Sequence, residues 1–147
     1  MAMSRATKLA TIEEWRELEY YYEYDKVEKC WIIIGSKEGI LNFYQTLKQY
    51  SKNVRNNKIG EHDHLGPYTY LTIVTWNEAL IKDDGIYGSL EDLSNLADII
   101  KIHLDKAAAS DMIKIDKEYS PVNQSYLKIF VKDDDFDPAS PDTQLFE

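Results

Sequence analysis

Four consecutive residues, Glu61, His62, Asp63 and His64, carry the side chains from which metal sites are built. On a β-strand successive side chains point to opposite faces, so His62 and His64 would share one face and offer two imidazole ligands. A closed zinc site needs four ligands, and the third histidine, His103, falls in a predicted helix. We therefore take His62 and His64 as candidate metal ligands. The alternative roles of this segment are a polar strand face or a partner-binding patch.

Signatures of catalysis are otherwise weak. Ser36 and Ser89 each follow a glycine but lack the G-x-S-x-G pattern of a nucleophile elbow, and no glycine-rich phosphate loop occurs. The single cysteine, Cys30, has no partner for an internal disulfide, which fits a reducing compartment, and its apolar neighbours indicate a structural role. We predict a cytoplasmic protein without catalytic residues and without a cofactor.

The segment "EYYYEYD", residues 19–25, is the strongest recognition signal. The chain has eleven tyrosines and three tryptophans, which are favoured at binding surfaces because they offer large contact areas with few rotatable bonds. As a strand, the segment would show Glu19, Tyr21, Glu23 and Asp25 on its outer face, which suits a basic protein partner. An edge strand that covers the core is the other interpretation. The candidate partner-binding residues are Tyr20, Tyr21, Tyr22, Glu23 and Tyr24, with Glu61 and Asp63 in a second patch.

Strands and helices alternate along the chain around these candidates. The segments 20–24 and 30–34 are expected to pair as a hairpin, and 68–76 is a strand by its β-branched and aromatic content. A short helix or hairpin is expected at the N-terminus, where Thr11 and Glu14 have capping-box spacing.

Two long helices are predicted to begin after Ser36 and Ser89. Each serine is a plausible N-cap, and each is followed by an acidic residue in the first turn, where the helix dipole favours negative charge. Apolar residues then recur at helical spacing on one face of each segment.

The chain carries one pattern twice. A shift of 53 positions places Gly35 on Gly88 and Ser36 on Ser89, and it brings the apolar faces of both helices into register. Further matches are Glu38 with Glu91, Asn42 with Asn95, and, after a longer shift, Leu71 with Leu127 and Ile73 with Ile129. We predict an α+β fold of two tandem β-α-β-β units, about 27–76 and 77–132, within one domain, 1–132. The units would form a mainly antiparallel sheet with two long helices packed on one face. The alternative is that Gly-Ser before an acid is only a generic strand-to-helix turn.

The negative charge is concentrated at the end of the sequence. The net charge is −9, and residues 133–147 hold six acids and no base. We expect a disordered acidic tail there, with contact to a basic partner as the alternative.

The acidic net charge argues against binding to nucleic acid. The apolar runs are too short to span a bilayer. The chain is expected to be a monomer or a homodimer.

Three segments, "IIIGSKEGILNFYQTL", "HDHL" and "YLTIVTW", resemble the bacterial immunity protein 32 family. The likeness covers residues 31–76 and extends more loosely over 85–132, where Asp92 replaces the second glycine and no histidine pair appears. The matching residues are Gly35, Ser36, Glu38, Gly39 and Ile40 at the helix start, and His62, His64 and Leu65 in the histidine strand. The resemblance implies a compact β-α-β-β protein that neutralises a bacterial toxin by stoichiometric binding.

We therefore predict a non-enzymatic protein-binding factor of the immunity or antitoxin type, with a basic toxin domain as its partner. The first alternative is a small structural or regulatory module of unknown ligand, possible as a homodimer. The second is a metal-binding protein that uses His62 and His64.

Overall fold

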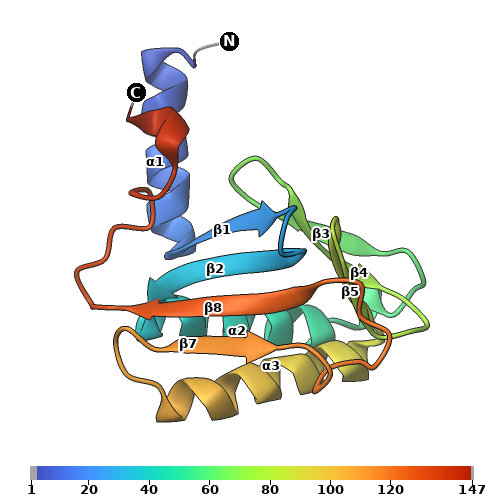
Figure 1. The fold of residues 1–147 in the computed structure, drawn as a ribbon. Helices are drawn as coiled ribbons and strands as arrows, with labels where there is room; N and C mark the ends of the chain where they lie inside the picture. The colour runs from blue at the N-terminus through green and yellow to red at the C-terminus, as the bar shows by residue number, and fades with distance from the viewer. Residues whose placement is uncertain (1–2, 147) are drawn as a thin grey trace.

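The computed structural model describes residues 3–146. Within this range the chain forms three α-helices, eight strands and two short 3₁₀ helices (Figure 1). In chain order they are α1 (Arg5–Leu18), β1 (Tyr20–Asp25), β2 (Cys30–Ser36), α2 (Lys37–Lys52), η1 (Val54–Asn56), β3 (His62–Leu65), β4 (Leu71–Thr75), β5 (Leu80–Lys82), β6 (Gly85–Gly88), α3 (Leu90–Lys106), β7 (Met112–Ile115), β8 (Tyr126–Lys132) and η2 (Thr143–Leu145). The predicted α+β class, with two long helices and a short N-terminal helix, is confirmed.

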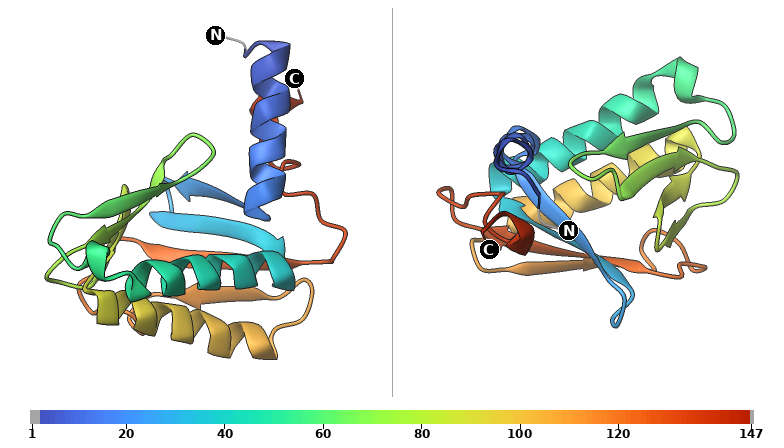
Figure 2. Two further views of the ribbon diagram at one scale, coloured as in Figure 1. Left: turned by 180° about the vertical axis from the view of Figure 1, so that it is seen from behind. Right: turned by 90° about the horizontal axis from the view of Figure 1, so that it is seen from above.

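The strands form two four-stranded sheets, ordered β1-β2-β8-β7 and β3-β4-β6-β5. The two central strands of each sheet are parallel, and the outer strands pair with them antiparallel, so four of the six pairings are antiparallel. The helices α2 and α3 lie side by side behind the first sheet, and the second sheet stands at one end of it (Figures 1 and 2). The core fills the space between the sheets and the helices.

The two halves of the chain exchange hairpins. The first sheet takes β1 and β2 from the first half and β7 and β8 from the second, while the other sheet takes β5 and β6 with β3 and β4. The register follows the sequence alignment, because Ile33 lies opposite Ile129 just as Ile86 lies opposite Ile73. Each half therefore opens with a hairpin, giving a β-β-α-β-β unit, and neither half can complete a sheet without the other.

The starts of α2 and α3 explain the repeated Gly-Ser. Ser36 accepts a hydrogen bond from Gly39 N at 3.1 Å, and Ser89 accepts one from Asp92 N at 3.0 Å. Asp92 returns a bond to the backbone of Ser89 and completes a capping box. Gly39, at the equivalent position of α2, has no side chain because a Cβ there would overlap the carbonyl oxygen of Glu19.

The N-terminal helix is longer than the capping-box spacing predicted. α1 begins after Ser4, whose side chain accepts from Thr7 N, and Thr11 lies inside the helix with its hydroxyl bonded to Thr7 O at 2.8 Å. A threonine inside a helix can bond its hydroxyl to a preceding carbonyl in this way. Thr11 is therefore not the N-cap that its spacing to Glu14 predicted. None of the helices within residues 3–146 has both the length and the apolar character needed to cross a bilayer.

Residues 133–146 do not form the disordered acidic tail that composition predicted for 133–147, of which Glu147 lies outside the described residues. They run back along α1 and end in η2 beside it (Figure 1). Ala139 is fully buried, Leu145 is almost so, and Asp137 forms an ion pair with Arg16 at 2.9 Å. Apolar anchors and paired carboxylates fix this segment, although its acidic composition alone favours disorder.

Candidate functional site: an aromatic groove along β1

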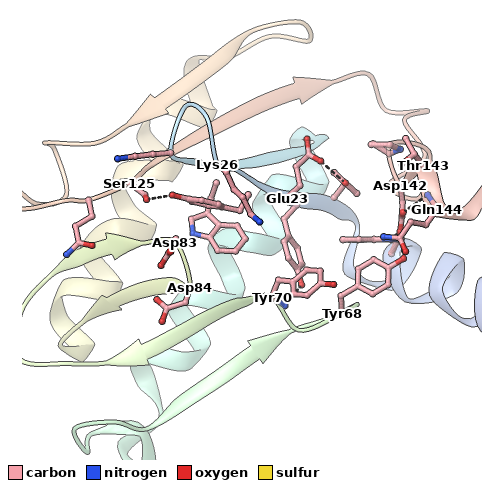
Figure 3. Close-up of a pocket in the computed structure, with 18 residues that line it drawn as sticks. Glu23, Lys26, Tyr68, Tyr70, Asp83, Asp84, Ser125, Asp142, Thr143 and Gln144 are labelled. Carbon is pink, nitrogen blue, oxygen red and sulfur yellow. Dashed lines mark hydrogen bonds between the residues drawn. The ribbon is translucent and has the colours of Figure 1, made fainter. Parts of the chain in front are cut away.

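A groove of about 930 Å³ follows the free edge of β1. The hairpin β5–β6 and the loop 66–70 lie across from β1, and the C-terminal residues 141–144 close one end (Figure 3). We call this cavity the aromatic groove, after the seven aromatic residues that line it. They are Trp15, Tyr21, Tyr22, Tyr24, Trp31, Tyr68 and Tyr70.

The floor of the groove is held by hydrogen bonds between the sheets. Trp31, on β2, packs against Tyr24 with ring centroids 5.1 Å apart, and its indole N–H donates to Lys82 O at 2.8 Å. The Tyr24 hydroxyl pairs with Ser125 Oγ at 2.7 Å. Each large ring is therefore fixed through its polar end, which leaves its face as a rigid surface.

The Tyr22 hydroxyl organises the loop across the groove. It lies 2.6 Å from Leu65 O and 2.7 Å from Pro67 O, and it accepts from Tyr70 N at 3.2 Å. Burial raises the pKa of Tyr22 to about 12, so the phenol stays protonated and able to donate at neutral pH. Two residues of this loop, Tyr68 and Thr69, have left-handed backbones with φ of 67° and 60°. Such conformations persist where the surroundings impose them, and here the Tyr22 hydroxyl supplies that constraint.

A buried carboxylate forms the closed end of the groove. Asp142 Oδ2 accepts from the Trp15 indole N–H at 3.0 Å and from the Tyr68 hydroxyl at 2.6 Å. Its other oxygen accepts from Gln144 N and caps η2. Burial together with the bond to Asp142 raises the pKa of Tyr68 well above its usual value. The carboxylate thus ties α1, the loop and the C-terminal segment into one wall.

The groove carries an excess of negative charge. Four carboxylates and two lysines line it, and Asp83 and Asp84 are exposed at the β5–β6 turn. Lys26 and Lys29 extend from the opposite hairpin, at the turn between β1 and β2. Tyr21 and Tyr22 stay neutral, because burial raises the pKa of each hydroxyl. The chemistry available is therefore contact through aromatic faces, hydroxyl groups and carboxylates.

Four of the five candidates in the tyrosine-rich strand meet in this groove. Tyr21, Tyr22, Glu23 and Tyr24 all line it. The prediction for Tyr20 is wrong, since this residue is fully buried against Phe43 of α2, with ring centroids 5.3 Å apart. Its side chain shares a face with those of Tyr22 and Tyr24, but these two reach loop 66–70 and Ser125 instead of α2.

The predicted outer face of β1 is only partly open. Tyr21 is 8% exposed because Trp15 of α1 covers it, with ring centroids 4.7 Å apart. The Tyr21 hydroxyl donates to Glu23 Oε2 at 3.0 Å, and Glu23 itself is exposed. The acidic side chain, and not the tyrosine, is the part of this face that a partner can reach.

The second predicted patch lies elsewhere. Glu61, His62, Asp63 and His64 belong to β3 and its start, at the edge of the other sheet, and none of them lines the groove. The two imidazoles are adjacent, with ring centroids 5.1 Å apart, and both are exposed. Among the described residues no third cysteine, histidine or acid joins them in a metal-binding group. The pair would hold a metal through two protein ligands.

A different cluster escaped the sequence analysis. Ligand atoms of Asp25, Glu28 and Cys30 lie within 4.8 Å of one another. The ammonium of Lys128 and the hydroxyl of Tyr126 already bind Glu28 Oε2, each at 3.0 Å. Burial raises the pKa of the Cys30 thiol and disfavours the thiolate that a metal requires. This cluster is an ion-pair network between β2 and β8.

The sequence analysis also missed the far wall of the groove. Tyr68, Tyr70 and Asp83 come from loops, and Asp142 comes from the segment that composition marked as disordered. The tyrosines of "GPYTY" were a usable signal, because that loop is the second place where aromatic residues gather. No local pattern links Asp142 to Trp15, which is 127 positions away.

Comparison of the chain with protein-family models, with curated proteins and with solved structures gives no match. The resemblance to an immunity protein family remains a prediction from the sequence. Function is therefore argued from the groove itself.

Proposed function

We propose that this chain is a non-enzymatic protein-binding factor of the immunity or antitoxin type, and that the aromatic groove receives part of a basic toxin domain. The observation that carries the proposal is the convergence of seven aromatic side chains and four carboxylates in one open groove. Neutralisation would follow from stoichiometric binding in the cytoplasm, without turnover.

The rigidity of the groove supports a binding role. Binding is weakened by the entropy lost when side chains become ordered, and rings that are already fixed avoid this loss. Tyr22, Tyr24 and Trp31 are each fixed by a hydrogen bond at the polar end of the ring. Tyrosine and tryptophan in such pockets are the residue types that dominate binding energy at protein interfaces.

The charge of the groove supports a basic partner. Asp83 and Asp84 are exposed at its rim, and the whole chain carries a net charge of −9. Complementary charge steers association and disfavours acidic competitors. A cationic side chain placed over the ring of Tyr70 would add a cation–π contact, because this ring is 64% exposed.

The test is a comparison of two exposed aromatic residues. The partner is the product of a neighbouring toxin gene, co-expressed with this chain for relief of toxicity and titrated against it by calorimetry. We expect Tyr70→Ala to weaken binding roughly thirtyfold, the effect of losing a contact worth about 2 kcal/mol, and to abolish protection. Trp76→Ala is the control, because Trp76 is 39% exposed but does not line the groove. Equal effects of the two substitutions, or no relief of toxicity by the unchanged chain, would contradict the proposal.

A second candidate function, metal binding at β3, is favoured by the adjacent rings of His62 and His64. Elemental analysis of the purified chain and titration with Zn²⁺ test it, with His103→Ala as the control, because this histidine lies on α3 and pairs with Glu118. Binding that disappears in both His62→Ala and His64→Ala would support this function. Metal-free protein whose stability does not respond to Zn²⁺ would remove it.

A further inference from the structure

The aromatic groove runs along an unpaired strand edge. β1 is the outermost strand of its sheet and pairs with β2 alone. Across residues 3–146 no backbone–backbone hydrogen bond joins β1 to any segment other than β2. Tyr21, Tyr22, Glu23 and Tyr24 are consecutive, and their side chains point alternately to the two faces, yet all of them line the groove. The groove therefore follows the edge of the strand and not one face of the sheet.

The backbone of Tyr22 points into this groove. Lys29 O accepts from Tyr126 N at 3.3 Å, so every second residue along β2, including Trp31 and Ile33, directs its backbone groups toward β8. Tyr22 stands opposite Ile33 and therefore directs its own N–H and C=O away from β2. The same alternation applies to Tyr24.

The equivalent strand in the second half is covered. Ile81 of β5 stands opposite Ile86, as Tyr22 stands opposite Ile33, and Ile33 and Ile86 are related by the 53-residue shift. Ile81 N donates to Asn123 Oδ1 at 2.8 Å, and Ile81 O accepts from the backbone N–H groups of Gln124 and Ser125. A segment of the loop between β7 and β8 thus already binds the outer edge of β5.

The loop 66–70, between β3 and β4, is the counterpart of that covering loop. It binds the Tyr22 hydroxyl and not the Tyr22 backbone, with contacts to Leu65 O, Pro67 O and Tyr70 N. Loop 66–70 is therefore separated from the backbone of β1 by the length of the Tyr22 side chain. The outer edge of β5 is covered by the backbone of a loop, whereas the outer edge of β1 borders the aromatic groove.

We infer that an extended, lysine- or arginine-containing segment of a protein partner adds to β1 as a fifth strand of the first sheet. This inference rests on the proposed function and specifies how the partner binds. Main-chain bonds to Tyr24, which is partly exposed, supply affinity, whereas Tyr22 is only 2% exposed. Alternate side chains of the segment enter the aromatic groove, and its cationic residues face Asp83 and Asp84. A second copy of this chain is the poorer occupant, because two chains of net charge −9 would bring like charges together.

The test uses a synthetic octapeptide of alternating lysine and valine, titrated against the full chain. Three comparison peptides separate the contributions. The first carries N-methyl groups on alternate backbone amides, the second carries them on the other set, and the third replaces lysine by glutamate. We expect at least a tenfold loss of affinity for one methylated peptide only, since one edge of the added strand faces β1, and no binding of the glutamate peptide.

Hydrogen exchange locates the added strand. We expect the peptide to slow exchange of the Tyr24 amide at least tenfold and to leave the Ile81 amide unchanged, because Ile81 N–H is already bonded. Asp83→Asn with Asp84→Asn should weaken binding, whereas Asp134→Asn, a carboxylate outside the groove, should not.

Equal binding of all the lysine peptides, or binding without slower exchange at Tyr24, would overturn strand addition. Failure of the lysine peptide to bind would overturn it as well, and slower exchange that depends on the concentration of this chain alone would assign the edge to a second copy. Relief of toxicity by co-expression is a separate measurement. The proposed function can therefore stand when strand addition falls, and the reverse result identifies a peptide-binding protein that is not an antitoxin.

Discussion

The two halves of the chain share their strand register and their serine helix caps but differ at their first strands. At equivalent positions β1 carries Tyr21 and Tyr22, and β5 carries Leu80 and Ile81. The aliphatic strand is sealed by the backbone of residues 124–125, and the aromatic strand borders an open groove. The two halves thus present one strand edge that a loop covers and one that borders a groove.

The difference lies outside the central strand pairs of the two sheets. Exchange of hairpins makes the central strand pairs, β2 with β8 and β4 with β6, common to both halves. Those pairs must match for either sheet to form, so they retain the same register and the same apolar alternation. The outer strands pair with one neighbour only and need not match a strand of the other half. The two halves differ at the outer strands β1 and β5.

The largest expected effect comes from one aligned position at the helix starts. Gly39→Ala should destabilise the protein by about 3 kcal/mol, because the added Cβ overlaps the carbonyl oxygen of Glu19 and the backbone must move. The equivalent change in the second half, Asp92→Ala, removes only the capping-box bond to Ser89 N and should cost about 1 kcal/mol. Urea denaturation of both variants measures the contrast. Equal losses would show that α1 does not approach α2 as closely as the structure has it.

The next largest effect is a difference in stability loss between equivalent positions of β1 and β5. Tyr22→Phe should cost about 2 kcal/mol, since Leu65 O and Pro67 O lose the one donor that they share and Tyr70 N loses its acceptor. Ile81→Val, at the equivalent position, removes one buried methyl group and should cost about 1 kcal/mol. Denaturation gives both values, and hydrogen exchange should show faster opening of loop 66–70 in Tyr22→Phe alone. Unchanged exchange in that loop would mean that other contacts position it.

The sequence was sufficient for the features that depend on local spacing. The Gly-Ser caps, the apolar stripes of α2 and α3 and the alternating strands all follow from periods of 3.6 or 2 residues. The alignment of Ile73 with Ile129 also anticipated equivalent strands. Which hairpin joins which sheet depends on pairings between β2 and β8 that span most of the chain, and no local pattern encodes such a choice.

The candidate site could be predicted on one side only. The residues of β1 are contiguous, so their aromatic and acidic character was visible in the sequence. The far wall comes from loop 66–70, the β5–β6 turn and the C-terminal segment, which meet only after folding. Alternation alone could not separate Tyr20 from Tyr22, because both point to one face, where Tyr20 packs against Phe43 of α2 and Tyr22 reaches loop 66–70.

The smallest expected effect is a pH dependence that distinguishes the Tyr22 hydroxyl from its aliphatic counterpart. Burial raises the pKa of Tyr22 in the folded protein to about 12, above the value near 10 of an unfolded tyrosine. The folded state therefore holds this proton more tightly. The contribution of Tyr22 to stability is complete below pH 10 and is lost as the pH rises toward 12, where the unfolded chain releases its proton first.

The measurement is the stability difference between the unchanged chain and Tyr22→Phe at pH 8 and at pH 11. We expect the difference to shrink at pH 11, because phenylalanine has no proton to lose. Tyr119, whose pKa is also raised by burial, has the same surroundings in both proteins and cancels in the comparison. For Ile81→Val the difference should be the same at both pH values. A Tyr22→Phe difference that does not change with pH would mean that the hydroxyl is solvated in the folded state, and loop 66–70 would then need another anchor.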